Sequence, residues 1–214
     1  MTTYTLTVKN ESGEAWDMYT FQKNPNIADP TLKSLAWFTK STAAYSAVKF
    51  SWDLNYNFMW AETGMLVPGV VFEANQSFPA NPFATAVAQH NLEGNQVQLT
   101  YHADDDYFEF VDGPPTPGVV RGTLYAVSDS TVPNGIASVG IGMSNAGTFA
   151  QPALTNIMAS FTPDPTYYVA AASSMQQGAV LEDEVSYAVE LQFAGVTALT
   201  ATFQPDHTWT VSAS

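Results

Sequence analysis

One stretch of this sequence restricts the fold more than any other, because apolar and mostly polar side chains alternate one by one over residues 48–60. A period of two is typical of a β-strand with one buried and one solvated face, whereas a helix repeats about every 3.6 residues. A single straight strand of this length would span roughly 40 Å at about 3.3 Å per residue, which is long for a compact sheet. We therefore expect a bend or turn between Asp53 and Asn57, and we expect Trp52 and Trp60 to pack in a core.

Shorter alternating runs occur at residues 4–8, 97–101 and 185–193, and glycine, proline, asparagine and aspartate separate the runs at short intervals. This pattern predicts an all-β fold, namely an antiparallel two-sheet β-sandwich of about 10–12 strands with little helix. Because no shift in composition divides the 214 residues, we expect a single β-sandwich domain over residues 1–214.

Three local features refine this prediction. Residues 204–207 should form the turn of a hairpin, since Pro205 is preset for the first central position of a type I turn. Residues 29–37 could form a short helix, with Asp29 as its cap and Pro30 at its first position. The glycine-rich residues 139–148 read as a strand to which backbone or a large aromatic ring approaches closely, followed by a turn at residues 145–147.

The charge of the chain excludes some partners. With 20 acidic and 6 basic side chains, the formal net charge is -14, and nucleic acid or an anionic membrane surface would be repelled. The absence of cysteine excludes thiol catalysis and iron–sulfur clusters. Neither a signal peptide nor a transmembrane segment is expected, so synthesis in the cytoplasm is predicted, with signal-independent export as an alternative.

A cluster of acidic residues is the first candidate site, and it consists of Asp104, Asp105, Asp106, Glu109 and Asp112. Ca²⁺ takes hard oxygen ligands and would relieve the repulsion between adjacent carboxylates, which makes it the one cofactor that this pattern suggests. The spacing does not follow an EF-hand. The alternative is a solvated loop between two edge strands, where charge discourages pairing with other sheets.

Aromatic side chains are the second candidate site. Rings on a surface can stack on sugars or lie at a lipid interface, and Trp37, Tyr107, Tyr167 and Tyr168 lie off the main alternating pattern. Adjacent strand residues face opposite ways, so one of Tyr167 and Tyr168 should lie outside the sheet that both help to form. These residues would suit a glycan or a neutral lipid.

An enzyme is not expected. The chain has no Gly-x-Ser-x-Gly elbow, and its three histidines lack metal-ligand spacing. An acid-dependent glycoside hydrolase stays open as an alternative, because the distances between paired carboxylates cannot be read from a sequence.

Several segments together resemble a group of short bacterial all-β proteins of similar length. The segments are Ser34-Leu35-Ala36-Trp37-Phe38, Phe50-Ser51-Trp52, Phe58-Met59-Trp60 with Glu62-Thr63-Gly64, Ala137-Ser138-Val139-Gly140-Ile141-Gly142-Met143, and Phe161-Thr162-Pro163-Asp164-Pro165. The resemblance implies a bacterial source and no particular activity, cofactor or catalytic residue.

Sparse charge, abundant small polar residues and the lack of an evident active site favour a protein that works through its surface. The leading hypothesis is a non-enzymatic structural protein that associates with copies of itself into an ordered assembly. A carbohydrate- or lipid-binding module, such as a lectin or toxin component, is the alternative.

Overall fold

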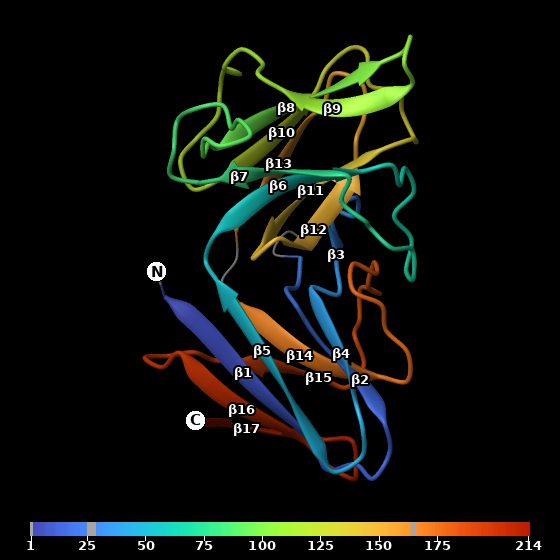
Figure 1. The fold of residues 1–214 in the computed structure, drawn as a ribbon, viewed down its shortest axis with the longest axis vertical. Helices are drawn as coiled ribbons and strands as arrows, with labels where there is room; N and C mark the ends of the chain where they lie inside the picture. Colours follow the sequence, from blue (N-terminus) through green and yellow to red (C-terminus); the bar gives the residue numbers. More distant parts are fainter. Residues whose placement is uncertain (1, 25–28, 164–165) are drawn as a thin grey trace.

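The computed structural model describes residues 2–24, 29–163 and 166–214, and in these residues every helix or strand element is a β-strand (Figure 1). The predicted all-β fold is confirmed. The described residues form 17 strands in four sheets, more than expected, because several strands are only two to four residues long. This part of the chain contains no helix of the length and apolarity needed to cross a membrane.

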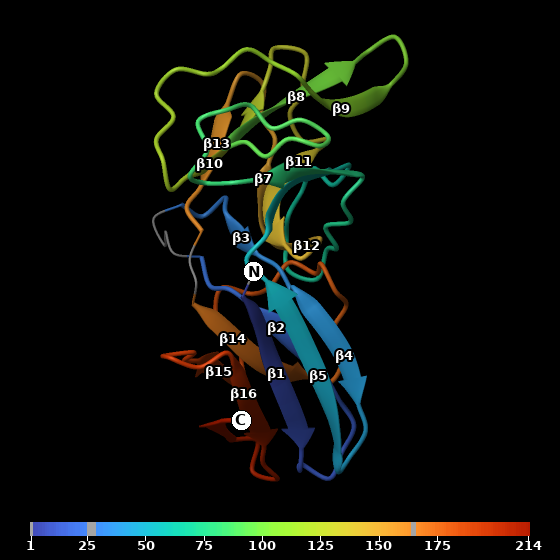
Figure 2. The same ribbon diagram turned by 60° about the vertical axis from the view of Figure 1, so that its left-hand side comes forward.

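Two of the sheets pack face to face at one end of the molecule, and we call this pair the first sandwich (Figure 2). Its strands are β1 (Thr3–Asn10), β2 (Trp16–Phe21), β4 (Phe38–Thr42), β5 (Ser46–Asp53), β14 (Tyr167–Ala172), β15 (Ala188–Leu191), β16 (Ala198–Phe203) and β17 (Trp209–Ala213). One sheet has the order β17-β16-β1-β5 and the other has the order β15-β14-β2-β4. Neighbouring strands are antiparallel except β1 and β16, which are parallel.

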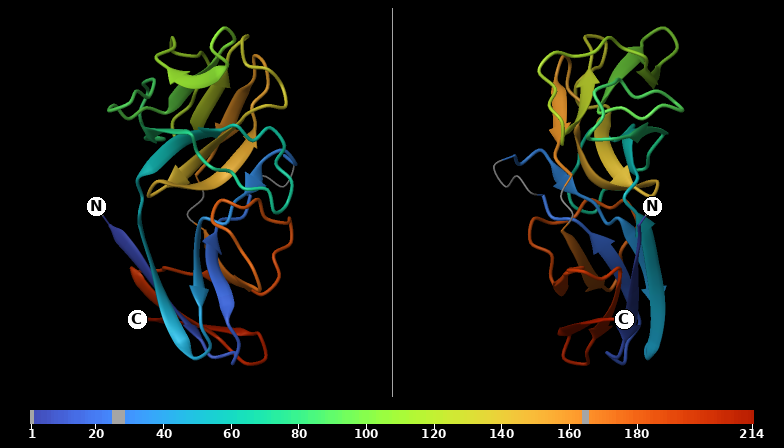
Figure 3. Two further views of the ribbon diagram at one scale, coloured as in Figure 1. Left: turned by 45° about the vertical axis from the view of Figure 1, so that its right-hand side comes forward. Right: turned by 90° about the vertical axis from the view of Figure 1, so that its left-hand side faces the viewer.

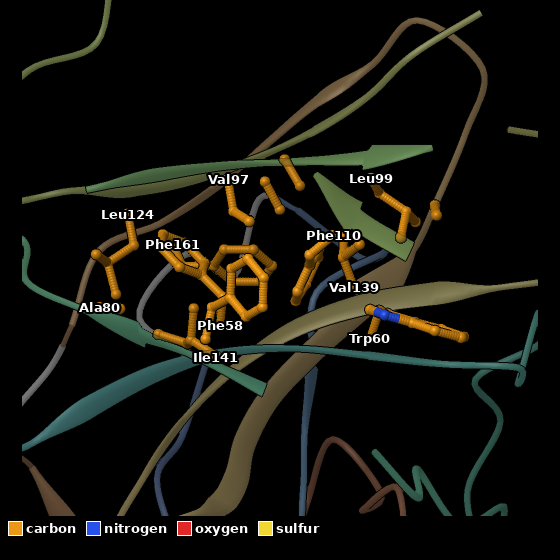
Figure 4. Packing of buried hydrophobic residues seen from close by; sticks show 14 of the residues in the cluster. Phe58, Trp60, Ala80, Val97, Leu99, Phe110, Leu124, Val139, Ile141 and Phe161 are labelled. Atoms are coloured by element: carbon orange, nitrogen blue, oxygen red, sulfur yellow. The ribbon is translucent and has the colours of Figure 1, made fainter. Parts of the chain in front are cut away.

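The other two sheets form the second sandwich, whose core is drawn in Figure 4. Its strands are β3 (Lys33–Ser34), β6 (Tyr56–Ala61), β7 (Gln76–Ala80), β8 (Gln96–His102), β9 (Tyr107–Val111), β10 (Leu124–Ser128), β11 (Ser138–Met143), β12 (Ala146–Pro152) and β13 (Met158–Phe161). The sheet orders are β3-β12-β11-β6-β7 and β13-β10-β8-β9. Phe58 and Ile141 of one sheet meet Leu99, Phe110 and Phe161 of the other in this core.

The chain passes between the two sandwiches several times, so neither consists of one continuous stretch of sequence (Figures 1 and 3). Between β2 and β4 it leaves the first sandwich, and β3 pairs with β12 at the edge of the second. It enters the second sandwich again from β5 to β6 and returns to the first at β14.

The bend expected in residues 53–57 is the crossing from β5 to β6. Strand β5 ends at Asp53 and β6 begins at Tyr56, and Ser144 from the turn between β11 and β12 holds the segment between them. The Ser144 hydroxyl accepts the N–H of Asp53 at 2.9 Å, and the N–H of Ser144 donates to Oδ1 of Asn55 at 3.2 Å. Trp52 and Trp60 are both buried as predicted, but Trp52 lies in the core of the first sandwich and Trp60 in that of the second.

The glycine-rich segment is a strand with a close neighbour, as expected. A Cβ atom on Gly140 would lie 2.4 Å from the carbonyl oxygen of Phe149 in β12. The turn that follows lies earlier than predicted, at Ser144 and Asn145, whose φ angles of 51° and 60° are those of a two-residue hairpin loop.

The helix predicted at residues 29–37 is wrong. Asp29 does accept the N–H of Thr31 at 2.9 Å, but this turn leads into β3 instead of a helix. The apolar residues that follow pack in three different clusters, with Leu32 in the second core, Trp37 in the first and Leu35 between them. A short helix presents one apolar stripe and could not reach all three.

The hairpin predicted around Pro205 is confirmed by the pairing of β16 with β17. The N–H of His207 donates to the carbonyl of Gln204 at 2.9 Å, which closes the turn, and His207 itself has a φ of 63°. By contrast, the alternating run at residues 185–193 forms a strand only over Ala188–Leu191.

Candidate functional site

The acidic cluster predicted as a Ca²⁺ site lies at the hairpin of β8 and β9. Asp104, Asp105 and Asp106 occupy the exposed turn, as in the solvated-loop alternative. The Oδ1 atom of Asp106 accepts the Tyr101 hydroxyl at 2.7 Å, so one of the three carboxylates already has a partner within the hairpin.

The other two acidic residues lie away from this turn. Glu109 is on β9, where its Oε2 atom is 3.4 Å from Nε2 of His102. Asp112 follows β9, and both residues line a hollow of about 600 Å³ together with His90. Among the residues that the structure describes, no three His, Asp or Glu side chains gather in a group that could hold a metal ion. Ca²⁺ binding therefore stays a prediction from the charge pattern.

Two of the four aromatic candidates are part of the core. Trp37 is fully buried, its Nε1–H donates to the carbonyl of Met143 at 3.0 Å, and its ring lies 5.2 Å from that of Trp52. Tyr167 is 3% exposed and packs in the same core. Neither ring is available to a ligand at the surface, which corrects the expectation that these residues could stack on a sugar or lipid.

The other two candidates lie nearer to solvent. Tyr168 faces the opposite side of its sheet from Tyr167, as predicted, and it stacks on Phe21 with Nζ of Lys23 at 4.6 Å from its ring centroid. Tyr107 is 41% exposed and stacks on His102 at 4.4 Å. The exposed Tyr107 and the partly buried Tyr168 belong to different sandwiches and do not form one site.

A cavity of about 740 Å³ lies beside the β15-β14-β2-β4 sheet. Tyr19 and Ala172 of this sheet and the segment of residues 173–187 line it. Tyr187 also lines the cavity, is 47% exposed and has a φ of 49°, which is unusual for a bulky residue. Sequence reasoning missed this site because its walls come from distant parts of the chain and no motif marks them.

A second surface feature is the edge of the other sheet of the first sandwich. Strand β17 is an edge strand of the sheet β17-β16-β1-β5, and in the described chain no strand pairs with its outer side. Thr210, Val211, Ser212 and Ala213 are all exposed. The turn before them is well fixed, since Asp206 accepts the hydroxyl of Thr208 at 2.7 Å, a bond that lowers the pKa of Asp206.

Comparison with known proteins identifies relatives over the whole chain. A family model described as RhiA matches residues 1–214. Protein RhiA of Rhizobium leguminosarum bv. viciae is 35% identical to this chain over 219 residues, which cover 99% of this chain and 87% of that protein. No solved structure matches. The bacterial relatives inferred from the sequence are thus a defined family, and neither description states an activity.

Proposed function

We propose that this chain, which belongs to the RhiA family over its whole length, is a non-enzymatic structural protein that associates with copies of itself through the outer edge of β17. The observation that carries this proposal is that β17 is an exposed sheet edge without the features that normally prevent strands of two molecules from pairing.

Sheet edges are usually protected by charge, proline or short length. Two edges here, β3 and β13, are two and four residues long. Each remaining edge except β17 contains a charged residue or a proline, namely Lys40 in β4, Lys49 in β5, Pro79 in β7, Glu109 in β9 and Glu190 in β15. Strand β17 has the sequence Trp-Thr-Val-Ser-Ala and contains neither. Strand β17 is therefore the edge on which a second copy could add a strand with the smallest free-energy penalty from buried charge or from a missing backbone N–H.

The hydrogen bonds of β17 indicate which backbone groups are available. The N–H of Ser214 donates to the carbonyl of Ala198, and the carbonyl of Thr208 accepts the N–H of Gln204, so even-numbered residues bond to β16. Hydrogen-bonded and non-bonded pairs alternate in an antiparallel ladder. The N–H and C=O groups of Trp209, Val211 and Ala213 consequently point away from β16.

This arrangement suits a two-fold pairing of β17 with β17 of a second copy. If the axis passes beside Val211, the two Val211 residues exchange both of their N–H···O bonds, and Trp209 of each copy lies opposite Ala213 of the other. The result is one continuous sheet across two molecules, which would be the building block of a larger assembly.

The experiment is a comparison of Val211→Pro with Val211→Ala by size-exclusion chromatography with light scattering. Proline at residue 211 removes an outward N–H and leaves the bonds to β16 in place, whereas alanine keeps the N–H. We expect the wild type and Val211→Ala to form dimers or larger species and Val211→Pro to be a monomer. Circular dichroism checks that each variant is folded, and Thr210→Lys, which adds a charge at the edge, should act as Val211→Pro does.

A wild-type protein that is a monomer at every concentration would refute self-association. Equal masses for assembled wild type and Val211→Pro would refute the β17 edge as the interface. Deletion of residues 4–8 is a poorer test, because β1 lies inside its sheet and Leu6 and Val8 are fully buried.

A further inference from the structure

The 740 Å³ cavity beneath the segment of residues 173–187 has properties that self-association does not use. Its volume lies within the roughly 300–1,000 Å³ of typical ligand sites. We propose that this cavity binds a neutral oligosaccharide, with the ring of Tyr187 against a sugar face.

The walls of the cavity are fixed by hydrogen bonds at both sandwiches. The N–H of Met175 donates to Oδ2 of Asp17 at 2.9 Å, and the N–H of Gly178 donates to the carbonyl of Ala36 at 2.7 Å. Farther along, the N–H of Leu181 donates to the carbonyl of Ser34 at 2.9 Å. Because the segment is anchored at several points, the cavity exists before a ligand arrives, and binding need not order a loop.

Two aromatic rings contribute to the lining of the cavity. Trp16 and Tyr187 meet edge to face with centroids 6.0 Å apart, and both line the cavity. Trp209 fixes the position of Tyr187, because its Nε1–H donates to the Tyr187 carbonyl at 2.8 Å. A left-handed conformation of a tyrosine is strained, and it persists only where the surroundings impose it. The structure thus holds an aromatic face in a fixed place beside the cavity, as stacking on a sugar requires.

Polar groups that can bind sugar hydroxyls line the same cavity as these rings. Glu182, Glu184 and Gln176 line the cavity and offer acceptors and a donor for sugar hydroxyls. Tyr19, 3% exposed, contributes to the lining. Burial raises the pKa of Tyr19 to about 12, so this hydroxyl stays neutral and is able both to donate and to accept.

The charge of the site decides between ligand classes. The lining contains two glutamates and no lysine or arginine, and the whole chain carries a net charge of -14. A phosphorylated lipid headgroup or an acidic polysaccharide would meet repulsion without a compensating cation. A neutral sugar avoids this cost, and it combines hydroxyls for the polar groups with C–H faces for Tyr187.

The test uses the full chain with cellotetraose, chitotetraose and maltotetraose as neutral probes and a galacturonic acid tetramer as the anionic one, measured by isothermal titration calorimetry. We expect binding of at least one neutral probe and none of the anionic one. Tyr187→Ala should weaken that binding by about tenfold, equivalent to about 1.4 kcal/mol, and Tyr187→Phe should preserve it. Ser174→Trp, which adds a ring at an exposed position of the cavity wall, should block it.

Tyr45→Ala is the matched control, because Tyr45 is also exposed and also has a positive φ but does not line the cavity. Equal losses in Tyr45→Ala and Tyr187→Ala, preferential binding of the anionic probe, or no binding of any neutral probe would each overturn the proposal. Binding to phosphatidylcholine vesicles that Tyr187→Ala abolishes, without sugar binding, would assign the cavity to lipid instead. Val211→Pro should bind sugar as the wild type does, so failure of self-association and failure of this site are separable.

Discussion

At the scale of single residues, Asp129 shows how one carboxylate can stabilise the packing of neighbouring strands. It follows β10 and accepts hydrogen bonds from side chains of β8. Burial of Asp129 opposes its ionisation, but hydrogen bonds from the hydroxyls of Thr100 and Thr131, from the N–H of Thr131 and from the amide of Gln98 favour the charged form. The net effect is a pKa lowered from 3.8. A carboxyl whose pKa is lower in the folded state stabilises the fold above its unfolded pKa, and this stabilisation is lost as the pH falls through the folded value.

We therefore expect Asp129→Asn to lower the free energy of unfolding at pH 7 by an amount on the order of 1 kcal/mol, discounted for partial exposure. The difference from the wild type should shrink as the pH falls below 3.8 and through the lower folded pKa, where the folded wild-type carboxyl takes up a proton. Urea denaturation at neutral and acidic pH measures both values. Asp105→Asn in the exposed turn is the control and should change little, and a difference that grows in acid would contradict the assignment.

Sequence reasoning had clear limits at this scale. It identified Trp52 and Trp60 as buried, but it could not assign them to two different cores, because alternation reports which face a side chain takes and not what covers that face. Tyr187 was missed as a site residue because a positive φ outside glycine has no sequence signature. Trp37 and Tyr167 were proposed for a surface and lie in a core, since neither belongs to a long alternating run.

At the scale of elements, the longest alternating run predicted its strands well, whereas the run at residues 185–193 gave only the four residues of β15. Residues 48–60 gave both β5 and β6 and the bend between them, and Pro205 marked the hairpin of β16 and β17. The helix prediction for residues 29–37 was wrong because the turn at Asp29 is followed by side chains that pack in three separate clusters. Tertiary packing decided the conformation there, as it often does for short segments.

The pairing of β11 with β12 leads to an element-scale prediction. Because the Cβ of an alanine at residue 140 would lie 2.4 Å from the carbonyl oxygen of Phe149, Gly140→Ala must push two hydrogen-bonded strands apart. We expect a loss of about 1–3 kcal/mol in the free energy of unfolding, measured by chemical denaturation. Ser160→Ala, at an exposed position of β13, should change it by less than about 0.5 kcal/mol. An unchanged stability in Gly140→Ala would mean that the two strands have more space than the geometry indicates.

At the scale of the whole molecule, net charge opposes the proposed assembly. Each copy carries a net charge of -14, while the β17 edge itself is uncharged, so copies repel one another without any compensating ion pair at that edge. The Debye length falls from about 30 Å at 0.01 M salt to about 10 Å at 0.1 M. We expect self-association to strengthen as salt rises over this range, and also as the pH is lowered toward the isoelectric point near 4.2. Sedimentation velocity measures this effect, and an association that salt weakens would indicate an ion-paired interface elsewhere.

The return of the chain to its starting sandwich has a consequence during synthesis. Strand β1 is translated before every strand of the second sandwich, yet its parallel neighbour β16 is translated after all of them, and Thr5 pairs with Ala198. Until then β1 has β5 on one side and nothing of its own sheet on the other. Contacts so distant in sequence form slowly, and an incomplete chain exposes strand edges and apolar surface in the meantime. The nascent polypeptide must therefore keep half of its first sandwich unfinished while the whole second one is translated, and strands β14 to β17, within residues 167–214, then close the molecule.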